Sequence, residues 1–157
     1  MSSHCNRSTV PSGCTNNRVR QLMRSVGLIY DAHLHAADMR ITQYTLLSHV
    51  LAASPVRPVD LARLMRMDAS TLTRNLKPLM DAGWVRMGPG EDQRSRLVHI
   101  TEAGRAKRDE AKRSWKAAQS ELNARLGLER VAALHVLIDE CLPLLDGGDD
   151  GTTGLSG

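Results

Sequence analysis

Residues 58–101 hold two short amphipathic segments followed by a glycine-interrupted alternating segment, and this order constrains the fold more than any other feature of the chain. Pro58 suits the first position of a helix, where an amide hydrogen has no helical partner in any case. Asp68 can cap a second helix, which Gly83 would end in the left-handed conformation. Residues 84–87 and 96–100 are runs of strand-forming side chains on either side of GPGEDQRS. They predict a two-stranded hairpin with a long charged tip.

Helices are also predicted before this region, because apolar residues recur there at intervals of three and four. The first helix has Thr15 or Asn16 as a plausible N-cap. Its apolar face consists of Val19, Leu22, Met23, Val26, Tyr30, His33, Leu34 and Ala37. Thr42 can cap a second helix, which stops at Ser54 because a residue before proline resists the helical conformation.

Two further helices are predicted after the hairpin. Thr101 can cap a long charged helix, which Gly127 breaks. The final helix, from about residue 128 to 145, has a broad apolar face. The residues of that face are Val131, Leu134, Leu137, Ile138, Cys141, Leu142 and Leu145.

These elements divide the 157 residues into one ordered domain between two tails. Residues 1–15 and 146–157 are rich in small and polar residues, so we expect both tails to be disordered. The central module spans residues 42–101, and the flanking helices occupy residues 16–41 and 102–145. With two Trp, two Tyr and no Phe, the core must be largely aliphatic. This composition argues against an all-β sandwich and predicts a mainly α chain with a small β-hairpin.

Composition also limits the compartment and the chemistry. No apolar run approaches the roughly 18 to 20 residues that span a membrane, and the N-terminus lacks the apolar stretch of a signal peptide, so we expect a cytoplasmic protein without membrane association. Three cysteines, Cys5, Cys14 and Cys141, argue against a disulfide framework. His33 and His35 point to different sides of a helix and do not suit one ion. We therefore expect no metal and no cofactor.

The helix predicted to follow Asp68 has the layout of the second helix of a helix-turn-helix, which enters the major groove of DNA. Its side chains outside the apolar face are Ser70, Thr71, Thr73, Arg74 and Lys77. Arg can bond bidentately to guanine, and Ser or Thr can bond bases or phosphates. A net charge of +4 permits a polyanionic partner. The alternative is that these side chains only solvate a surface face.

The charged hairpin tip favours the DNA-binding interpretation. Arg94 lies near Asp92, which can hold the guanidinium extended. A cationic finger beside a recognition helix is a wing, and the narrow minor groove of A/T-rich DNA attracts such an Arg. We therefore expect Arg94 to reach the minor groove.

Two motifs carry a resemblance to a known family. They resemble the wing and the recognition helix of MarR family winged helix-turn-helix regulators. The wing motif is DQR at residues 92–94 with LVHITEAG at 97–104, and the recognition-helix motif is STLTR at 70–74 with AGWV at 82–85. The resemblance covers roughly residues 16–145. It implies a homodimer whose first and last helices interlock, and a double-stranded, pseudo-palindromic operator with half-sites about 10 bp apart. The resemblance also implies that Arg86, Arg96 and Lys77 contact phosphates, where they supply affinity rather than specificity. It implies repression as well, the commoner role in the family.

The resemblance further implies a small anionic or aromatic effector, bound where the dimerisation helices meet the DNA-binding module. Tyr30, His33, Tyr44 and Trp115 are the candidate pocket residues, because they supply rings and hydrogen-bonding groups in a chain poor in aromatics. The alternative for each of them is a place in the core.

Oxidation is the rival signal. Cys14 lies just before the first helix, where the peroxide-sensing branch of the family keeps its reactive cysteine, and a helix N-terminus lowers the pKa of a thiol. That branch pairs the cysteine with two tyrosines. Aligning Tyr30 with one of them puts Ile41 in the place of the other, and Cys14 falls out of register.

A hydrolase is the alternative from another class. Cys14, His99 and either Asp92 or Asp139 are the residue types of a nucleophile, base and orienter, but no nucleophile-elbow motif surrounds them. The segment GPG lacks the spacing and the Lys-Ser/Thr of a phosphate loop. We therefore expect a DNA-binding regulator and not an enzyme.

Overall fold

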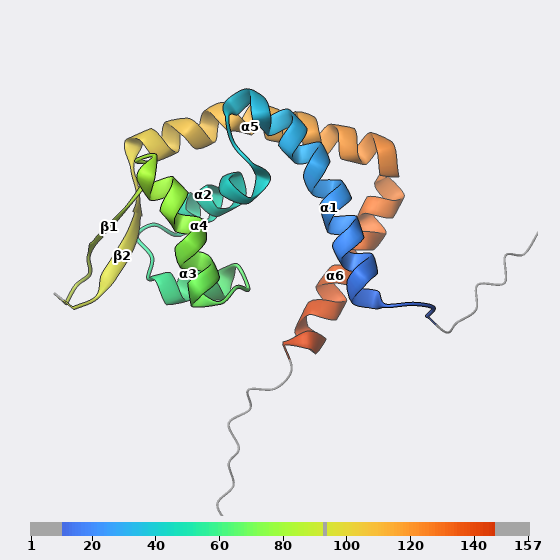
Figure 1. Ribbon diagram of the computed structural model, residues 1–157, viewed down its shortest axis with the longest axis horizontal. Coiled ribbons are helices and arrows are strands. Elements are labelled where there is room, and N and C mark those ends of the chain that lie inside the picture. The colour runs from blue at the N-terminus through green and yellow to red at the C-terminus, as the bar shows by residue number, and fades with distance from the viewer. Residues whose placement is uncertain (1–10, 93, 147–157) are drawn as a thin grey trace, which may run out of the picture. The chain divides into compact units, whose positions relative to one another are not determined.

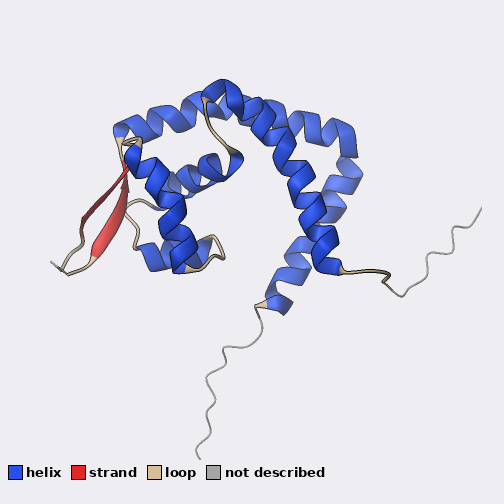
Figure 2. Cartoon of the chain, in the orientation of Figure 1, coloured by secondary structure: helices blue, strands red, loops and turns tan. Residues whose placement is uncertain are grey.

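The computed structural model describes residues 11–92 and 94–146, so most of both expected tails, with Cys5, lies outside the described ranges (Figure 1). The chain divides into two compact units, residues 1–118 and 119–157. Helices predominate, and the sheet is one antiparallel hairpin, as expected (Figure 2). The elements in chain order are α1 (Thr15–Leu34), η1 (His35–Ala37), α2 (Ile41–Ala53), α3 (Pro58–Leu64), α4 (Ala69–Asp81), β1 (Val85–Pro89), β2 (Arg96–Ile100), α5 (Glu102–Leu126) and α6 (Leu128–Leu145).

Two predicted caps are wrong. The N-cap of α1 is Cys14, because the helix starts at Thr15 itself. The N-cap of α2 is Arg40 rather than Thr42. Gln43 Oε1 accepts the Arg40 amide at 2.9 Å, and Asp31 Oδ1 from α1 accepts the next amide, that of Ile41, at 2.7 Å. These side chains satisfy the start of α2 earlier than a cap at Thr42 would.

The helix ends that depend on strong local signals are confirmed. α2 stops before Pro55, and α3 begins at Pro58. The Asp68 carboxylate caps α4 by accepting the Thr71 amide at 2.8 Å. Gly83 follows α4 with a φ of 74°, the left-handed conformation that glycine adopts without steric cost. The first helix, in contrast, ends at Leu34, short of the predicted residue 37.

The second strand has the predicted bounds, but the first runs over Val85–Pro89 and not over the predicted residues 84–87. Val85 lies opposite Ile100 at one end and Pro89 opposite Arg96 at the other, so the turn covers only residues 90–95. Val56, between α2 and α3, exchanges two backbone hydrogen bonds with Val98, at 3.1 and 2.8 Å. This bridge adds a short third segment beside β2, which sequence patterns did not indicate.

The core of the central module is aliphatic, as the composition predicted. α4 packs against α2, α3 and β1, and α2 packs against β2. The largest fully buried side chains are Leu34, Leu46, Leu47, Leu61, Leu72, Leu79, Val50 and Val98. α4 therefore stands on a closed core and turns its remaining sides to solvent.

The second unit contains the end of α5 and all of α6, and Gly127, with a φ of 83°, separates the two helices. Val131 is buried, but most of the predicted apolar face of α6 is not. Its exposed large apolar residues are Leu128, Val136, Leu137, Ile138, Leu144 and Leu145. Within the described residues, no helix has the length and apolar character needed to cross a membrane.

Candidate nucleic-acid interface

The start of α4 is organised by one carboxylate. Asp68 Oδ1 accepts the Ser70 hydroxyl at 2.5 Å, and Oδ2 accepts the Thr71 hydroxyl at 2.6 Å. These hydrogen bonds, the one from Ser70 foremost, hold the pKa of the Asp68 carboxyl well below its usual range. Asp68 therefore remains ionised at neutral pH and fixes where both hydroxyl hydrogens point.

The other predicted α4 contact residues lie on its exposed surface. The Thr73 hydroxyl donates to the Ala69 carbonyl one turn earlier, at 2.8 Å. Arg74 Nη2 lies 3.4 Å from Thr71 Oγ1, while Lys77 pairs with Asp81 at 2.8 Å. Ser70, Thr73, Arg74 and Lys77 are all exposed, and Thr71 is half-buried. One helix thus presents hydroxyls at its start and cations beyond them.

The wing tip is held by Ser95. Its amide donates to the Asp92 carbonyl at 3.0 Å, its hydroxyl donates to Asp92 Oδ1 at 2.5 Å, and its carbonyl accepts the Gly90 amide at 2.7 Å. The hydroxyl of Ser95 lowers the pKa of the Asp92 carboxyl. Asp92 therefore shapes the turn through Ser95, which corrects the expected contact with Arg94. Arg94 itself is exposed at this tip.

Arg86 and Arg96 are both exposed, and the strand register places them on opposite faces of the hairpin, with Arg96 on the face of Val98 and Ile100. Arg86 stands opposite His99 in the register, and both side chains lie across Gly88. A Cβ at Gly88 would come within 2.9 Å of Arg86 Nη1 and of His99 Nε2. Gly88 therefore lets a cation and an imidazole lie close to the strand, which is a role in the wing rather than in a phosphate loop.

Two of the four predicted effector residues, Tyr44 on α2 and Trp115 on α5, come together. Tyr44 and Trp115 stack with ring centroids 5.9 Å apart and planes inclined by 17°. The Arg108 guanidinium lies 5.9 Å from the Tyr44 ring centroid, and its Nε is 3.5 Å from Ser48 Oγ. The stack borders a surface pocket of about 250 Å³, lined by Tyr44, Thr45, Ser48, His49, Arg108, Lys112 and Trp115. An aromatic wall beside two cations suits a small aromatic anion.

Tyr30 and His33 are not among the residues that line this pocket. Tyr30 is buried on α1, and burial raises the pKa of its phenol; His33 is half-buried on the same helix. Cys14 is exposed at the start of α1, and Cys141 is exposed on α6. For Tyr30 the burial favours a place in the core.

The residues of the hydrolase alternative do not form a hydrogen-bonded relay. His99 Nε2 is buried and has no hydrogen-bond partner among the described residues. The Asp92 carboxylate accepts from Ser95 instead. Within the same ranges, no three His, Cys, Asp or Glu side chains are grouped so that they could hold a metal ion.

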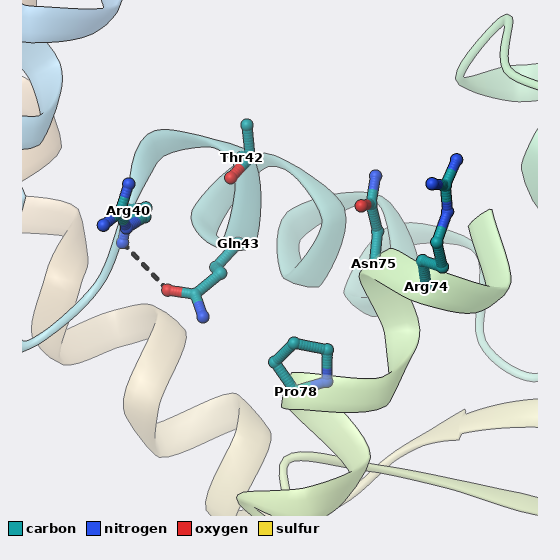
Figure 3. A pocket seen from close by; sticks show the side chains of 6 residues that line it. All are labelled: Arg40, Thr42, Gln43, Arg74, Asn75 and Pro78. Atoms are coloured by element: carbon teal, nitrogen blue, oxygen red, sulfur yellow. Dashed lines mark hydrogen bonds between the residues drawn. The ribbon is translucent and has the colours of Figure 1, made fainter. Parts of the chain in front are cut away.

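Two groups of polar residues were missed from the sequence. On α5, Arg108 and Lys112 share one helix face with the predicted Trp115, and this spacing is a signal that can be read from the sequence. A second pocket is lined by Arg40, Thr42, Gln43, Arg74, Asn75 and Pro78, from α2 and α4 (Figure 3). No local pattern links these two helix segments, since about 30 residues separate them in the chain.

Comparison with known proteins places this geometry among DNA-binding regulators. The family model described as MarR family matches residues 37–95. The multiple antibiotic resistance protein MarR of Salmonella typhimurium is 31% identical over 113 residues, which cover 71% of this chain and 78% of that protein.

Two solved structures are similar in fold. A cysteine-to-serine mutant of Escherichia coli MarR, complexed with operator DNA, has a TM-score of 0.74 and 26% identity, with 82% of this chain and 93% of that chain covered. The Mycobacterium tuberculosis regulator MosR in complex with DNA has a TM-score of 0.66 and 29% identity, with coverage of 83% and 99%.

Proposed function

The chain belongs to the MarR family of winged helix-turn-helix transcription regulators, and from this premise we propose that it is a cytoplasmic repressor that binds a pseudo-palindromic DNA operator as a homodimer. α4 enters the major groove, and the wing tip reaches the adjacent minor groove. The observation that carries this proposal is the exposed row of hydroxyls and cations on α4 beside a wing that exposes Arg94.

The hydrogen bonds within α4 limit which DNA groups its hydroxyls can bind. Because Ser70 and Thr71 donate to Asp68 and Thr73 donates to Ala69, all three hydroxyls offer only lone pairs to a partner. Phosphates have no hydrogen to donate, whereas adenine N6 and cytosine N4 do. The hydroxyls therefore favour bases with exposed amino groups, and the phosphate contacts fall to Lys77, Arg86 and Arg96.

Dimerisation explains the exposed apolar residues of the terminal helices. Leu137 and Ile138 on α6 are 57% and 43% exposed in a single chain, and Leu22 and Met23 on α1 are 40% and 63% exposed. Apolar surface of this kind is covered by association, and a two-fold dimer places two recognition helices on half-sites about 10 bp apart.

The test of DNA binding uses duplexes from the region upstream of the protein's own gene, in fluorescence anisotropy titrations at several salt concentrations. Repression predicts a defined high-affinity site, with affinity that falls steeply as salt rises because bound phosphates release counterions. Equal affinity for that site and for a scrambled duplex of the same composition would contradict sequence-specific regulation.

The effector belongs in the pocket beside the Tyr44–Trp115 stack. A small aromatic anion there lies against the Trp115 ring and pairs with Arg108 or Lys112. Arg108 comes from α5 and Tyr44 from α2, so a ligand that rearranges their contact shifts α2 against α5. Release of DNA follows if that shift moves the recognition helices out of register.

A single-tryptophan variant tests this pocket. The chain has two Trp, so Trp84→Phe leaves Trp115 as the reporter. We expect aromatic acids that release DNA to quench Trp115 fluorescence at the same concentrations, and Arg108→Ala to abolish both effects. DNA release without any change at Trp115 would place the effector elsewhere.

Thiol oxidation remains the second candidate for the signal, supported by the exposure of Cys14 directly before α1. Mild peroxide treatment followed by mass spectrometry and a DNA-binding assay tests it. Oxidation of Cys14 together with loss of DNA binding supports this mechanism, and persistent binding with unmodified Cys14 removes it.

A further inference from the structure

The pocket between α2 and α4 has a volume of about 290 Å³ and lies outside the residues assigned to DNA from the sequence, except for Arg74. In Figure 3, Arg40 and Thr42 come from the start of α2, and Arg74 and Asn75 come from the middle of α4, with the Pro78 ring between them. α2 and α4 pack against each other within the same unit.

The chemistry of this pocket suits an oxyanion. Both guanidinium groups are hydrogen-bond donors with no acceptor. Gln43, which also lines the pocket, accepts the Arg40 amide through Oε1 at 2.9 Å, so its side-chain NH₂ group remains as a donor (Figure 3). None of the six described residues that line the pocket is acidic. Two positive charges with additional donors are the groups that recognise phosphate.

The position of the pocket points to the phosphate of a DNA backbone. Arg74 is shared between the pocket and the exposed surface of α4. A helix in the major groove is flanked by a phosphate backbone on each side, since the groove is only about 12 Å wide. α4 packs against α2, α3 and β1, and the α2 side brings this pocket, with its two guanidinium groups, beside α4 as a contact for one of those backbones.

We propose that the α2–α4 pocket binds a backbone phosphate of the operator, with Arg40 as its principal charge and Gln43 and Thr42 as supporting donors. This inference rests on the proposed function, because it requires α4 to occupy the major groove. The phosphate lies beside the segment that Arg74 contacts, so Arg40 fixes the position of α4 in the groove without reading a base.

The experiment compares Arg40→Gln with Arg113→Gln, which removes the same charge from an exposed position on α5 beside Asp109 and Glu110. Anisotropy titrations with operator and with scrambled duplex are run from 50 to 200 mM salt. Loss of one phosphate contact per subunit lowers the salt slope by about 0.9 per subunit. Arg40→Gln should then reduce the affinity lost over this salt range by about fourfold per subunit, equally for both duplexes.

Three results overturn the inference. In the first, Arg40→Gln has the same salt slope as the native chain and as Arg113→Gln. If the native chain still binds its operator, this result leaves the proposed function intact. Alternatively, Arg40→Gln can lower the affinity for the operator duplex and leave the affinity for the scrambled duplex unchanged, which makes Arg40 a base contact. Alternatively, millimolar inorganic phosphate at constant ionic strength can bind the native chain but not Arg40→Gln and leave the affinity for DNA unchanged, which makes the pocket a site for free phosphate. Absence of operator binding by the native chain contradicts the proposed function itself.

Discussion

The central module and the terminal helices use apolar residues in opposite ways. In the module, Leu47, Leu61 and Leu79 are fully buried. On α6, in contrast, Leu137 is 57% exposed and Leu145 is 80% exposed. The module closes its own core, whereas α6 presents an apolar face that a single chain leaves in water.

This difference in burial assigns DNA contact to the central module and association to the terminal helices. A closed core holds α4 and the wing in fixed positions, which a DNA reader requires because its side chains must meet base edges at hydrogen-bond distance. An open apolar face contributes free energy only when a second surface covers it, so it couples the fold of these helices to association. The following changes test the division, beginning with the largest expected effect.

Leu47→Ala should lower the free energy of unfolding by about 2 to 5 kcal/mol, because it leaves a cavity in the closed core. Chemical denaturation at a fixed protein concentration measures this effect. Leu64→Ala makes the same change at a side chain that is 59% exposed in the same module, and we expect less than about 0.5 kcal/mol there. Equal losses for the two variants would show that the module core is not closed as described.

Leu137→Asp should weaken the dimer by at least about 2 kcal/mol, or roughly thirtyfold in dissociation constant, because it buries a charge at the proposed interface. Sedimentation equilibrium over a range of concentrations measures the monomer fraction, and circular dichroism checks that the helices persist. Val59→Asp, at an exposed position on α3, is the control and should leave the oligomeric state unchanged. A native chain that is monomeric throughout would remove the homodimer.

Arg94→Ala should weaken operator binding by about 1 to 3 kcal/mol, because it removes the minor-groove cation from the wing tip. Arg113→Ala, which carries the same charge change on α5, should have a much smaller effect. Gel shift or anisotropy at one salt concentration gives the comparison. Unchanged operator affinity for Arg94→Ala would sink the assignment of this residue.

The smallest effect concerns the cap of α4. Because hydrogen bonds hold the pKa of Asp68 below the ordinary carboxyl value of 3.8, this group stabilises the fold fully above that pH, and the stabilisation is lost as pH falls through the lowered pKa. Asp68→Asn keeps a capping oxygen but cannot titrate. The urea midpoint of this variant should therefore decline less between pH 5 and pH 2 than that of the native chain. Glu91→Gln, in the wing, is the control.

Much of the fold follows from local signals in the sequence. Pro58, Asp68, Gly83 and Thr101 act within one helical turn, and each has the predicted role at its helix end. The α4 surface was also predictable, because helical periodicity alone separates its polar residues from its buried leucines.

The features that sequence reading missed depend on contacts between distant segments. Asp31 sets the start of α2 from ten residues away, and Val56 meets Val98 across more than 40 residues. Tyr44 and Trp115 were both chosen as pocket residues, but their stacking and the cations around them depend on how α2 meets α5. Asp92 was expected to hold Arg94, yet in the turn that forms its carboxylate accepts the Ser95 hydroxyl.

Thr101 joins three elements through one oxygen atom. Its hydroxyl donates toward the carbonyls of Gly83 and Trp84, at 2.6 and 3.0 Å, and accepts the Gly104 amide at 3.0 Å. A substitution of Thr101 therefore affects three places at once: the end of α4, the start of β1 and the first turn of α5. Serine preserves all three connections, whereas valine, of nearly the same shape, removes them together and leaves only the backbone hydrogen bond from the amide of residue 101 to the Trp84 carbonyl, at 3.1 Å.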